Sequence, residues 1–515
     1  LDGTDYITFN AIDVTAPNSG IEYGYLTNKP SATDGCQNVS ITNSNITMTK
    51  GISPYVIGIY ISNGASSPSI ATGVVVTALS GENQNISITG NTITNVHAGI
   101  VFRGSSAAGF YDENMTVGAA GAGNTITNFG GASATTTYGV YFIYVNNASV
   151  AYNTINNIAS GGTAHGATLY GIFYSVVSGN INGSNNAFTI SNSSASASYA
   201  IYQGNLVTQE TYNSNTFASG TISSTGIVYL LYASNATTNK TVNGNSIAGT
   251  FTRSAAGTIY GYYNLGAPAS GTETVTNNQF TNITNTAAGA VYLFYTSIGT
   301  LANRVFTGNV MSNVSSGTGS IYCGYVLGAF VNQISNNTVS NISTGGLVYA
   351  FYNSGTTLTH TNNTVNNITV GSTFYGIYAY GTTSSVTNNS ITGVTETGTG
   401  AVYGVYLSST CTNGTVASNT LSGFTSAGST LMGMYIGAGT SNVNKNKIVN
   451  FNSTNATTPI VSGINVALNN ANLTNNIIGD LRATAANSAS GIAPSVRGVN
   501  ITSATANTNI NLYHN

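Results

Sequence analysis

A short phrase centred on asparagine returns along the whole chain and constrains its fold more than any other feature. The phrase runs apolar, two spacers, asparagine, one spacer, apolar, two spacers, apolar, as in Val386, Asn389, Ile391 and Val394. Self-similarity at a spacing of about 26 to 33 residues indicates a solenoid rather than a globular domain. We name the asparagine of each phrase the anchor, and the anchors are Asn91, Asn124, Asn153, Asn186, Asn215, Asn245, Asn278, Asn309, Asn337, Asn363, Asn389, Asn419, Asn446 and Asn476, with looser copies at Asn10 and Ser44 and a truncated one at Asn515.

A second phrase, Tyr-x-x-Tyr, follows about half a period after each anchor, as in Tyr375 to Tyr378. Both phrases are rich in β-branched and aromatic residues, which is typical of strands, and Gly, Ser, Thr and Asn between them indicate turns. Such a unit cannot bury its own apolar face, but strands stacked about 4.8 Å apart can pair in parallel with their copies. The sequence therefore predicts an all-β fold, a right-handed parallel β-helix of about sixteen coils.

The repeat also sets the expected domain organisation. It runs without a linker, so residues 1–515 are predicted to form a single solenoid. Residues 46–82 are expected to be a loop excursion beside a strand near Ile57, because the next anchor is delayed to Asn91. Residues 480–515 are expected to be an irregular last coil that continues in a longer protein.

Each anchor is expected at a sharp corner of its coil, because asparagine tolerates the left-handed backbone region. Its amide carries a donor and an acceptor, so stacked anchors can hydrogen-bond from coil to coil. The position two residues after the anchor should form a buried column. Its residues are Ile93, Ile126, Ile155, Phe188, Phe217, Ile247, Phe280, Met311, Val339, Val365, Ile391, Leu421, Ile448 and Ile478.

The two tyrosines of the second phrase form two columns. Residues three apart on a regular strand face opposite sides, so we expect the first column, from Tyr138 to Tyr403, in the core. The second column would then be an outer stripe that could bind sugars or a partner, or could simply stack on its own copies, the interpretation favoured here. The candidate binding residues are Tyr141, Tyr202, Tyr232, Tyr263, Tyr295, Tyr325, Tyr352, Tyr378 and Tyr406.

Charge is scarce, at 4% of residues with a formal net charge of −2. Nucleic acid is therefore not an expected partner, and neither is membrane insertion, because the sequence contains no apolar run of spanning length. With 12 Asp and Glu in all, no catalytic residue, metal site or cofactor is predicted. The densest ionisable patch is either a small acid/base or cation site or, as we favour, a solvated loop, and it contains Glu82, His97, Arg103, Asp112 and Glu113.

Four charged residues stand five positions before successive anchors and alternate in sign: Glu210, Lys240, Glu273 and Arg304. We expect them to stack as a row of opposite charges on the outer face. The three cysteines, Cys36, Cys323 and Cys411, are widely spaced and are expected to be free thiols. His360 occupies an apolar column and is expected to be packed rather than catalytic.

The opening Leu1-Asp2-Gly3-Thr4-Asp5-Tyr6-Ile7-Thr8, the Asn-Asn-Thr phrases and the Tyr-Gly-Ile-Tyr strands resemble right-handed β-helix repeat proteins. In particular they resemble large secreted surface proteins of Bacteroidota-type bacteria, and the wider pectate-lyase-like superfamily shares the fold. The resemblance implies export, often by the type IX route, and a role in surface attachment.

The expected function is thus a non-catalytic extracellular shaft or adhesive stalk with surface glycans or cell-surface machinery as partners. The alternatives are a carbohydrate-active lyase or hydrolase and a filament subunit that associates end to end.

Overall fold

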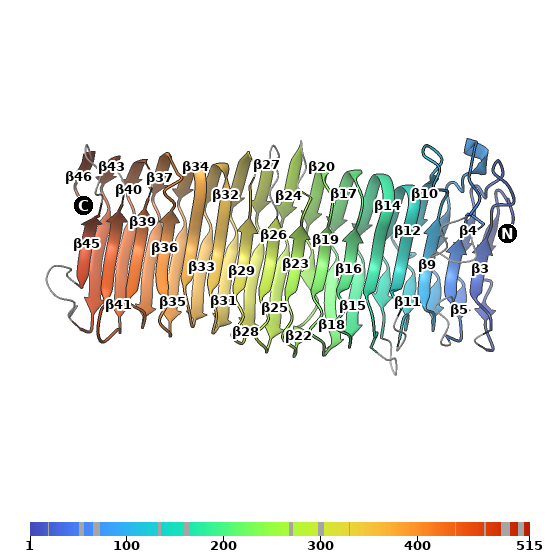
Figure 1. Cartoon of the computed structure of the whole chain (residues 1–515), viewed down its shortest axis with the longest axis horizontal. Helices are drawn as coiled ribbons and strands as arrows, with labels where there is room; N and C mark the ends of the chain where they lie inside the picture. Colours follow the sequence, from blue (N-terminus) through green and yellow to red (C-terminus); the bar gives the residue numbers. More distant parts are fainter. Residues whose placement is uncertain are drawn as a thin grey trace. The chain divides into compact units, whose positions relative to one another are not determined.

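The computed structural model consists of parallel strands stacked coil upon coil (Figure 1). It describes residues 1–18, 20–50, 56–64, 73–131, 135–158, 164–266, 271–296, 303–328, 330–437, 439–467, 470–485, 495–502 and 509–515. The chain divides into two compact units. Unit 1 comprises Leu1–Ser254 with Tyr263–Gly266, and unit 2 comprises Ala255–Tyr262 with Ala267–Asn515.

The fold class is confirmed as an all-β parallel solenoid. Strands account for 63% of the residues, and the described coils make about 15 turns, close to the sixteen expected. Among the described residues the helical structure is a single 3₁₀ turn, η1 (Leu79–Gly81). A search of those residues finds no helix with the length and apolarity needed to cross a membrane.

Each coil contributes strands to three columns, which we name by their place relative to the anchor and the tyrosines. In unit 1 the anchor strands are β2 (Val14–Thr15), β5 (Asn45–Thr47), β8 (Thr92–Thr94), β11 (Thr125–Thr127), β13 (Thr154–Asn156), β15 (Ala187–Asn192), β18 (Thr216–Ile222), β21 (Ser246–Ile247) and β22 (Phe251–Arg253). The tyrosine strands are β3 (Tyr23–Thr27), β6 (Ile57–Ile61), β9 (Ala98–Arg103), β16 (Ser198–Gln203) and β19 (Val228–Ala233). The pre-anchor strands are β1 (Thr8–Asn10), β4 (Ser40–Thr42), β7 (Ser87–Thr89), β10 (Asp112–Val117), β17 (Val207–Asn213) and β20 (Thr237–Asn243). The tyrosine and pre-anchor strands are continuous in β12 (Thr137–Ala151) and β14 (Leu169–Ser184).

Unit 2 repeats the same plan, and the tyrosine strand β23 (Ile259–Asn264) has residues in both units. Its anchor strands are β25 (Gln279–Asn285), β28 (Val310–Ser316), β31 (Thr338–Thr344), β33 (Thr364–Val370), β35 (Ser390–Glu396), β38 (Thr420–Ser426), β41 (Lys447–Ser453) and β44 (Ile477–Ala483). Its tyrosine strands are β26 (Val291–Thr296), β29 (Ile321–Val326), β36 (Ala401–Leu407), β39 (Thr430–Ile436), β42 (Ile460–Val466) and β45 (Val496–Ile501). Its pre-anchor strands are β24 (Thr272–Thr276), β27 (Asn303–Thr307), β30 (Val331–Ser335), β37 (Asn413–Ala417), β40 (Thr440–Asn444), β43 (Asn470–Thr474) and β46 (Asn509–Tyr513), and the tyrosine and pre-anchor strands merge in β32 (Val348–Thr361) and β34 (Phe374–Thr387).

The predicted core column lies inside. Val365 is paired in register with Val339 on one side and Ile391 on the other, and all three are fully buried. The other members are buried as well, except Ile478, which is partly exposed. In the expected loop excursion, the strand near Ile57 is present as β6, while residues 51–55 and 65–72 lie outside the described residues. In the irregular last coil, β45 and β46 pair with β42 and β43, while residues 486–494 and 503–508 are not described.

The anchors form a buried hydrogen-bonded ladder within each unit, as expected. The Asn363 amide Nδ2 donates to Asn389 Oδ1 at 2.9 Å and to the Ile334 carbonyl at 2.9 Å. Its Oδ1 accepts from the backbone N–H and the Nδ2 of Asn337. The same pattern runs from Asn91 to Asn245 in unit 1 and from Asn278 to Asn515 in unit 2.

The left-handed corners, however, are not at the anchors. Positive φ falls on the residue before the anchor, as at Asn362 (56°), and on the residue four after it, as at Asn367 (52°). These positions point their amides outward and form further, exposed ladders, in which Asn367 Nδ2 donates to Asn341 Oδ1 at 2.7 Å. None of the described anchors from Asn91 to Asn476 has a positive φ, and their side chains lie buried against one another.

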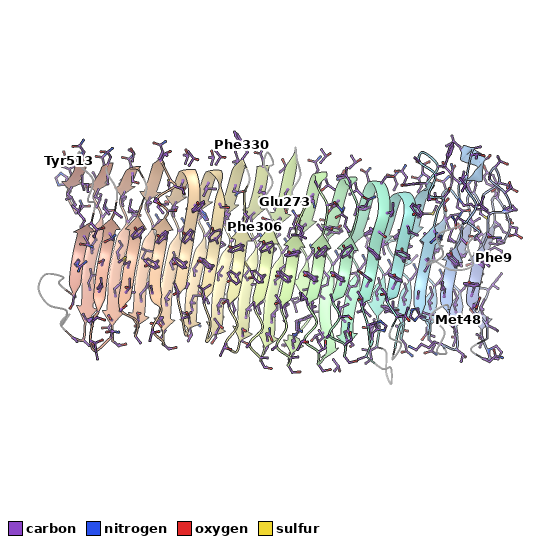
Figure 2. The ribbon with its side chains drawn as sticks, viewed as in Figure 1. Phe9, Met48, Glu273, Phe306, Phe330 and Tyr513 are labelled. Atoms are coloured by element: carbon purple, nitrogen blue, oxygen red, sulfur yellow. The ribbon has the colours of Figure 1, made fainter. Side chains whose placement is uncertain are left out.

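Within each unit the charged residues pair as expected, but the expectation that they lie on the outer face is wrong. Glu210 pairs in register with Lys240 in unit 1, and Glu273 with Arg304 in unit 2. All four side chains are buried, and Glu273 is seen in Figure 2 together with the core residue Phe306. These are therefore interior ion pairs, with Arg304 Nε 2.6 Å from Glu273 Oε2.

Candidate functional site

Both tyrosine columns lie on the outward face of their strands. The expected core position of the first column is therefore wrong. In β32, Val348 and Phe351 are buried, while Tyr349 and Tyr352 are partly exposed. Ala350, between them, is also fully buried, so two successive residues face the interior and the strict alternation is interrupted. The irregularity recurs from coil to coil, and it brings tyrosines three residues apart to one face.

The two columns make one aromatic surface, which we call the tyrosine stripe. Within a coil the rings of Tyr349 and Tyr352 meet edge to face, with centroids 5.4 Å apart and planes at 89°. Between coils, Tyr349 stacks on Tyr375 at 4.7 Å, and Tyr352 stacks on Tyr378 at 4.9 Å. These are the separations at which aromatic pairs attract one another beyond simple burial.

The same geometry is found in both units. In unit 1, Tyr199 stacks on Tyr229 at 4.9 Å and Tyr202 on Tyr232 at 4.6 Å. All predicted binding residues lie in the stripe, but Tyr141 is only 7% exposed and contributes little surface. Tyr202, Tyr232, Tyr263, Tyr295, Tyr325, Tyr352, Tyr378 and Tyr406 are all partly exposed.

Stacking determines which chemistry the stripe can offer. A ring covered on both faces by its neighbours presents its edge and hydroxyl group to solvent rather than a free face. Burial raises the pKa of Tyr352 and of Tyr375 to about 12, so both hydroxyls stay protonated at neutral pH. The stripe is therefore a row of neutral hydrogen-bond donors and acceptors set in an apolar strip.

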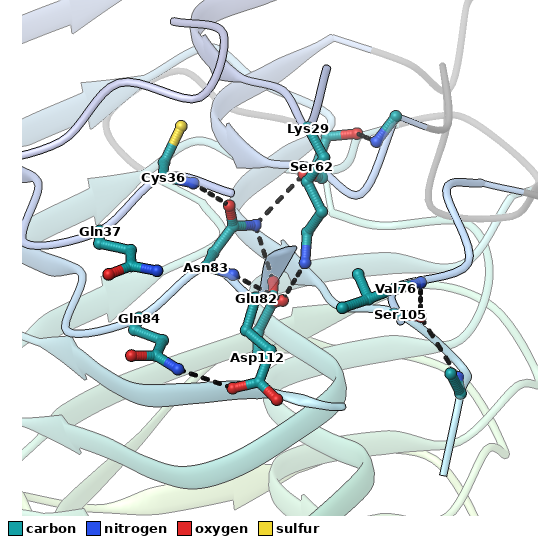
Figure 3. A network of polar contacts seen from close by, with 12 residues as sticks. Lys29, Cys36, Gln37, Ser62, Val76, Glu82, Asn83, Gln84, Ser105 and Asp112 are labelled. Carbon is teal, nitrogen blue, oxygen red and sulfur yellow. Dashed lines mark hydrogen bonds and ion pairs between the residues drawn. The ribbon is translucent and has the colours of Figure 1, made fainter. Parts of the chain in front are cut away.

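The solvated loop expected for the ionisable patch is wrong, because Glu82, His97, Arg103 and Asp112 are all buried. Figure 3 shows the polar contacts around Asp112 and Glu82. Asp112 is completely buried and pairs with Lys29, a residue that the sequence analysis did not connect to it. Its carboxylate also accepts from the backbone N–H of Asn83 at 3.0 Å and from Asn83 Nδ2 at 2.8 Å. Burial raises the pKa of Asp112, although Lys29 and Asn83 act in the opposite direction. Nothing in the sequence links residues 29 and 112, which are 83 positions apart.

The other members of the patch have separate surroundings. His97 contacts the Thr136 carbonyl oxygen at 3.0 Å, and burial lowers its pKa. Arg103 is buried in β9. Of the five patch residues, Glu82 and Glu113 are the two that line a surface cavity of about 490 Å³. Tyr111 and Asn146 line the same cavity. Burial raises the pKa of Glu82, with smaller contributions from Glu113 and Asp112.

A second hollow of about 400 Å³ lies over β10, β12, β14 and β17 and is lined by the amides of Asn114, Asn147, Asn180 and Gln209. Among the described residues no group of three His, Cys, Asp or Glu side chains is arranged to hold a metal ion. Comparison with family models, with curated proteins and with solved structures found no match to this chain.

Proposed function

We propose that this protein is a non-catalytic extracellular shaft of a secreted bacterial surface protein, and that the tyrosine stripe binds surface glycans. The tyrosine stripe is the observation that carries the proposal, because it repeats one set of hydroxyl groups and ring edges along each unit. Glycans are repeating polymers, and a ladder of identical sites can engage successive sugars with increasing avidity. The anchor ladders support the shaft role, since they tie each coil to the next by buried hydrogen bonds.

Affinity electrophoresis against a panel of soluble acidic and neutral polysaccharides tests the binding. The triple variant Tyr352→Phe, Tyr378→Phe and Tyr406→Phe keeps the rings and removes three hydroxyls, so it should weaken binding without loss of the fold. Three hydrogen bonds at about 0.5–1.5 kcal/mol each amount to about 1.5–4.5 kcal/mol, so the expected loss is on the order of 10- to 1,000-fold in affinity. Tyr380→Phe is the matched control, because Tyr380 is 43% exposed and lies outside both columns. Binding that the triple variant and the control reduce equally would contradict the proposal.

A carbohydrate-active enzyme is the second candidate, and the cavity that holds Glu82 and Glu113 favours it. Two carboxylates flanking a sugar can serve as acid and base. We expect no release of unsaturated or reducing sugars from polygalacturonate or alginate, with or without Ca²⁺. Activity that is lost in Glu113→Gln, and kept in the triple tyrosine variant, would establish the enzyme instead.

A further inference from the structure

Three polar side chains meet in the interior of unit 1. Glu210 on β17 and Lys240 on β20 are register partners, and Asn264 ends β23. Lys240 Nζ lies 2.9 Å from Asn264 Oδ1 and 3.3 Å from Glu210 Oε1. The three side chains are between 0% and 1% exposed. A carboxamide and a carboxyl group therefore both contact one amine in a site closed to solvent.

We propose that Lys240 and Asn264 condense into an intramolecular amide cross-link, with Glu210 as the proton carrier. Lys240 Nζ forms a bond to Asn264 Cγ, and the bond from Cγ to Nδ2 breaks. Glu210 takes a proton from the attacking nitrogen and returns one to the leaving nitrogen, which departs as ammonia. A primary amide and an amine give a secondary amide and ammonia, so the step balances without oxidant, reductant or cofactor.

The surroundings favour each part of this step. Burial disfavours the charged forms of Lys240 and Glu210, so transfer of a proton from the ammonium to the carboxylate costs less here than in water. The folded chain also holds the reacting groups in contact, and such positioning can replace an effective concentration of about 10⁵ M or more. Exclusion of water protects the intermediate from hydrolysis.

Tyr212 completes the site. It is two residues from Glu210, and burial together with the Glu210 carboxylate raises the pKa of Tyr212 well above its usual value. Its hydroxyl therefore remains protonated and can hydrogen-bond to Glu210 while that carboxyl group changes its charge. Lys240 is further positioned by the Asn235 carbonyl oxygen, 2.9 Å from Nζ.

The chain's other buried cations show what distinguishes this site. Arg304 pairs with Glu273, but a guanidinium is permanently charged and supplies no nucleophilic amine. Lys29 faces the Asp112 carboxylate, which accepts three hydrogen bonds as an anion and resists attack by an amine. Lys50 Nζ also contacts a neutral amide, Asn128 Oδ1 at 3.0 Å, but that contact is only partly buried. Of the fully buried lysines in the described part of the chain, Lys240 is the one whose amine contacts a neutral amide.

The cross-link would join a pre-anchor strand to a tyrosine strand through the interior of a coil. It would close a covalent loop over the 24 positions that separate the two residues. Such a bond resists pulling and unfolding, which suits a shaft, but its existence does not depend on glycan binding.

Intact mass spectrometry of the purified, folded chain tests the inference. When the folded chain is denatured for the measurement, its mass should be lower than the mass calculated from the sequence by one ammonia. A digest should contain the Lys240 peptide joined to the Asn264 peptide. Lys240→Arg and Glu210→Gln should both restore the full sequence mass. The first removes the nucleophile and the second removes the proton carrier with little change of shape.

Two results would overturn the inference. One is a folded wild-type chain that keeps its full sequence mass after prolonged incubation. The other is an ammonia loss without joined peptides, because succinimide formation at an asparagine produces the same change in mass. The wild-type measurement stands even if either variant fails to fold.

Discussion

Replacing one anchor in the middle of unit 2 tests the physical basis of the fold. Asn363→Ala removes four hydrogen bonds: two donated by Nδ2 to Ile334 and Asn389, and two accepted from Asn337. The buried backbone N–H of Asn337 then loses its hydrogen-bond acceptor. The orphaned buried donor costs about 1–3 kcal/mol and the other three bonds contribute about 1 kcal/mol each, so we expect a loss of about 4–6 kcal/mol.

The matched control is Asn367→Gly, four residues away. Asn367 is exposed and has a φ of 52°, which glycine adopts without strain. It loses one exposed amide contact to Asn341, so we expect a change within about 0.5 kcal/mol. Urea unfolding followed by circular dichroism measures both variants. Hydrogen exchange of peptides around Asn337 reports local opening, because repeat arrays can open one coil at a time.

A third variant separates shape from hydrogen bonding. Asn363→Asp keeps the shape but cannot donate, and it places a carboxylate in the buried ladder. Burial should raise the pKa of the new acid above its unfolded value, so the penalty is present at neutral pH and shrinks as pH falls through the folded pKa. The reasoning is refuted if Asn363→Ala is no more destabilising than Asn367→Gly, or if the loss of stability of the Asp variant relative to the wild type is the same at pH 7 and pH 4.

Three further outcomes are expected. Burial lowers the pKa of His360 to about 3, so folding holds it neutral and stability falls as pH drops from about 6.5 toward 3; His360→Ile should reduce that loss in acid unfolding curves. Lys29→Met leaves Asp112 as an uncompensated buried charge and should cost about 3–5 kcal/mol in urea unfolding, with partial recovery in the double variant Lys29→Met, Asp112→Leu. Cys323 is fully buried and burial raises its thiol pKa, so it should resist maleimide until denaturant is added; labelling in the native state would contradict its placement. All three cysteines are free thiols, as the sequence predicted.

The parts of the fold that repeat could be predicted from sequence. The anchor position, the column two residues after it and the alternation of strands and turns all follow from spacing, because stacking identical coils enforces their register. The hydrogen-bonded ladder of anchors was therefore predicted from the sequence and is confirmed. The spacing did not predict which residue takes positive φ, since asparagine occupies the anchor and both corner positions alike, as at Asn362, Asn363 and Asn367.

The errors arose where a local irregularity overrides a simple rule. Counting faces from Tyr349 to Tyr352 assumes strict alternation, and the two buried residues between them break it. The link between Lys29 and Asp112 was invisible because neither residue belongs to the repeat. The contact of Lys240 with Asn264 was missed for a different reason. The charged residues were noticed, but Asn264 looked like one of many asparagines.

The presence of buried ion pairs in this fold requires an explanation other than a gain in the free energy of unfolding. In unit 2 the position five before the anchor reads Glu273, Arg304, Asn332 and Leu358 on coils paired in register. Leu358 is fully buried at this position, so the interior of the coil can accept an apolar side chain here and does not require a charged one. A buried ion pair is often no more stable than an apolar pair of similar volume, yet separating its members costs about 3–5 kcal/mol.

That asymmetry matters in a chain whose coils are nearly interchangeable. A slip by one coil would still match valine with isoleucine in the core column and asparagine with asparagine in the ladder. It would separate Glu273 from Arg304 and leave each of them buried against a neutral side chain. The non-repeating charges therefore select one register among many similar ones, and they can do so only from the interior, where water cannot compensate a lost partner.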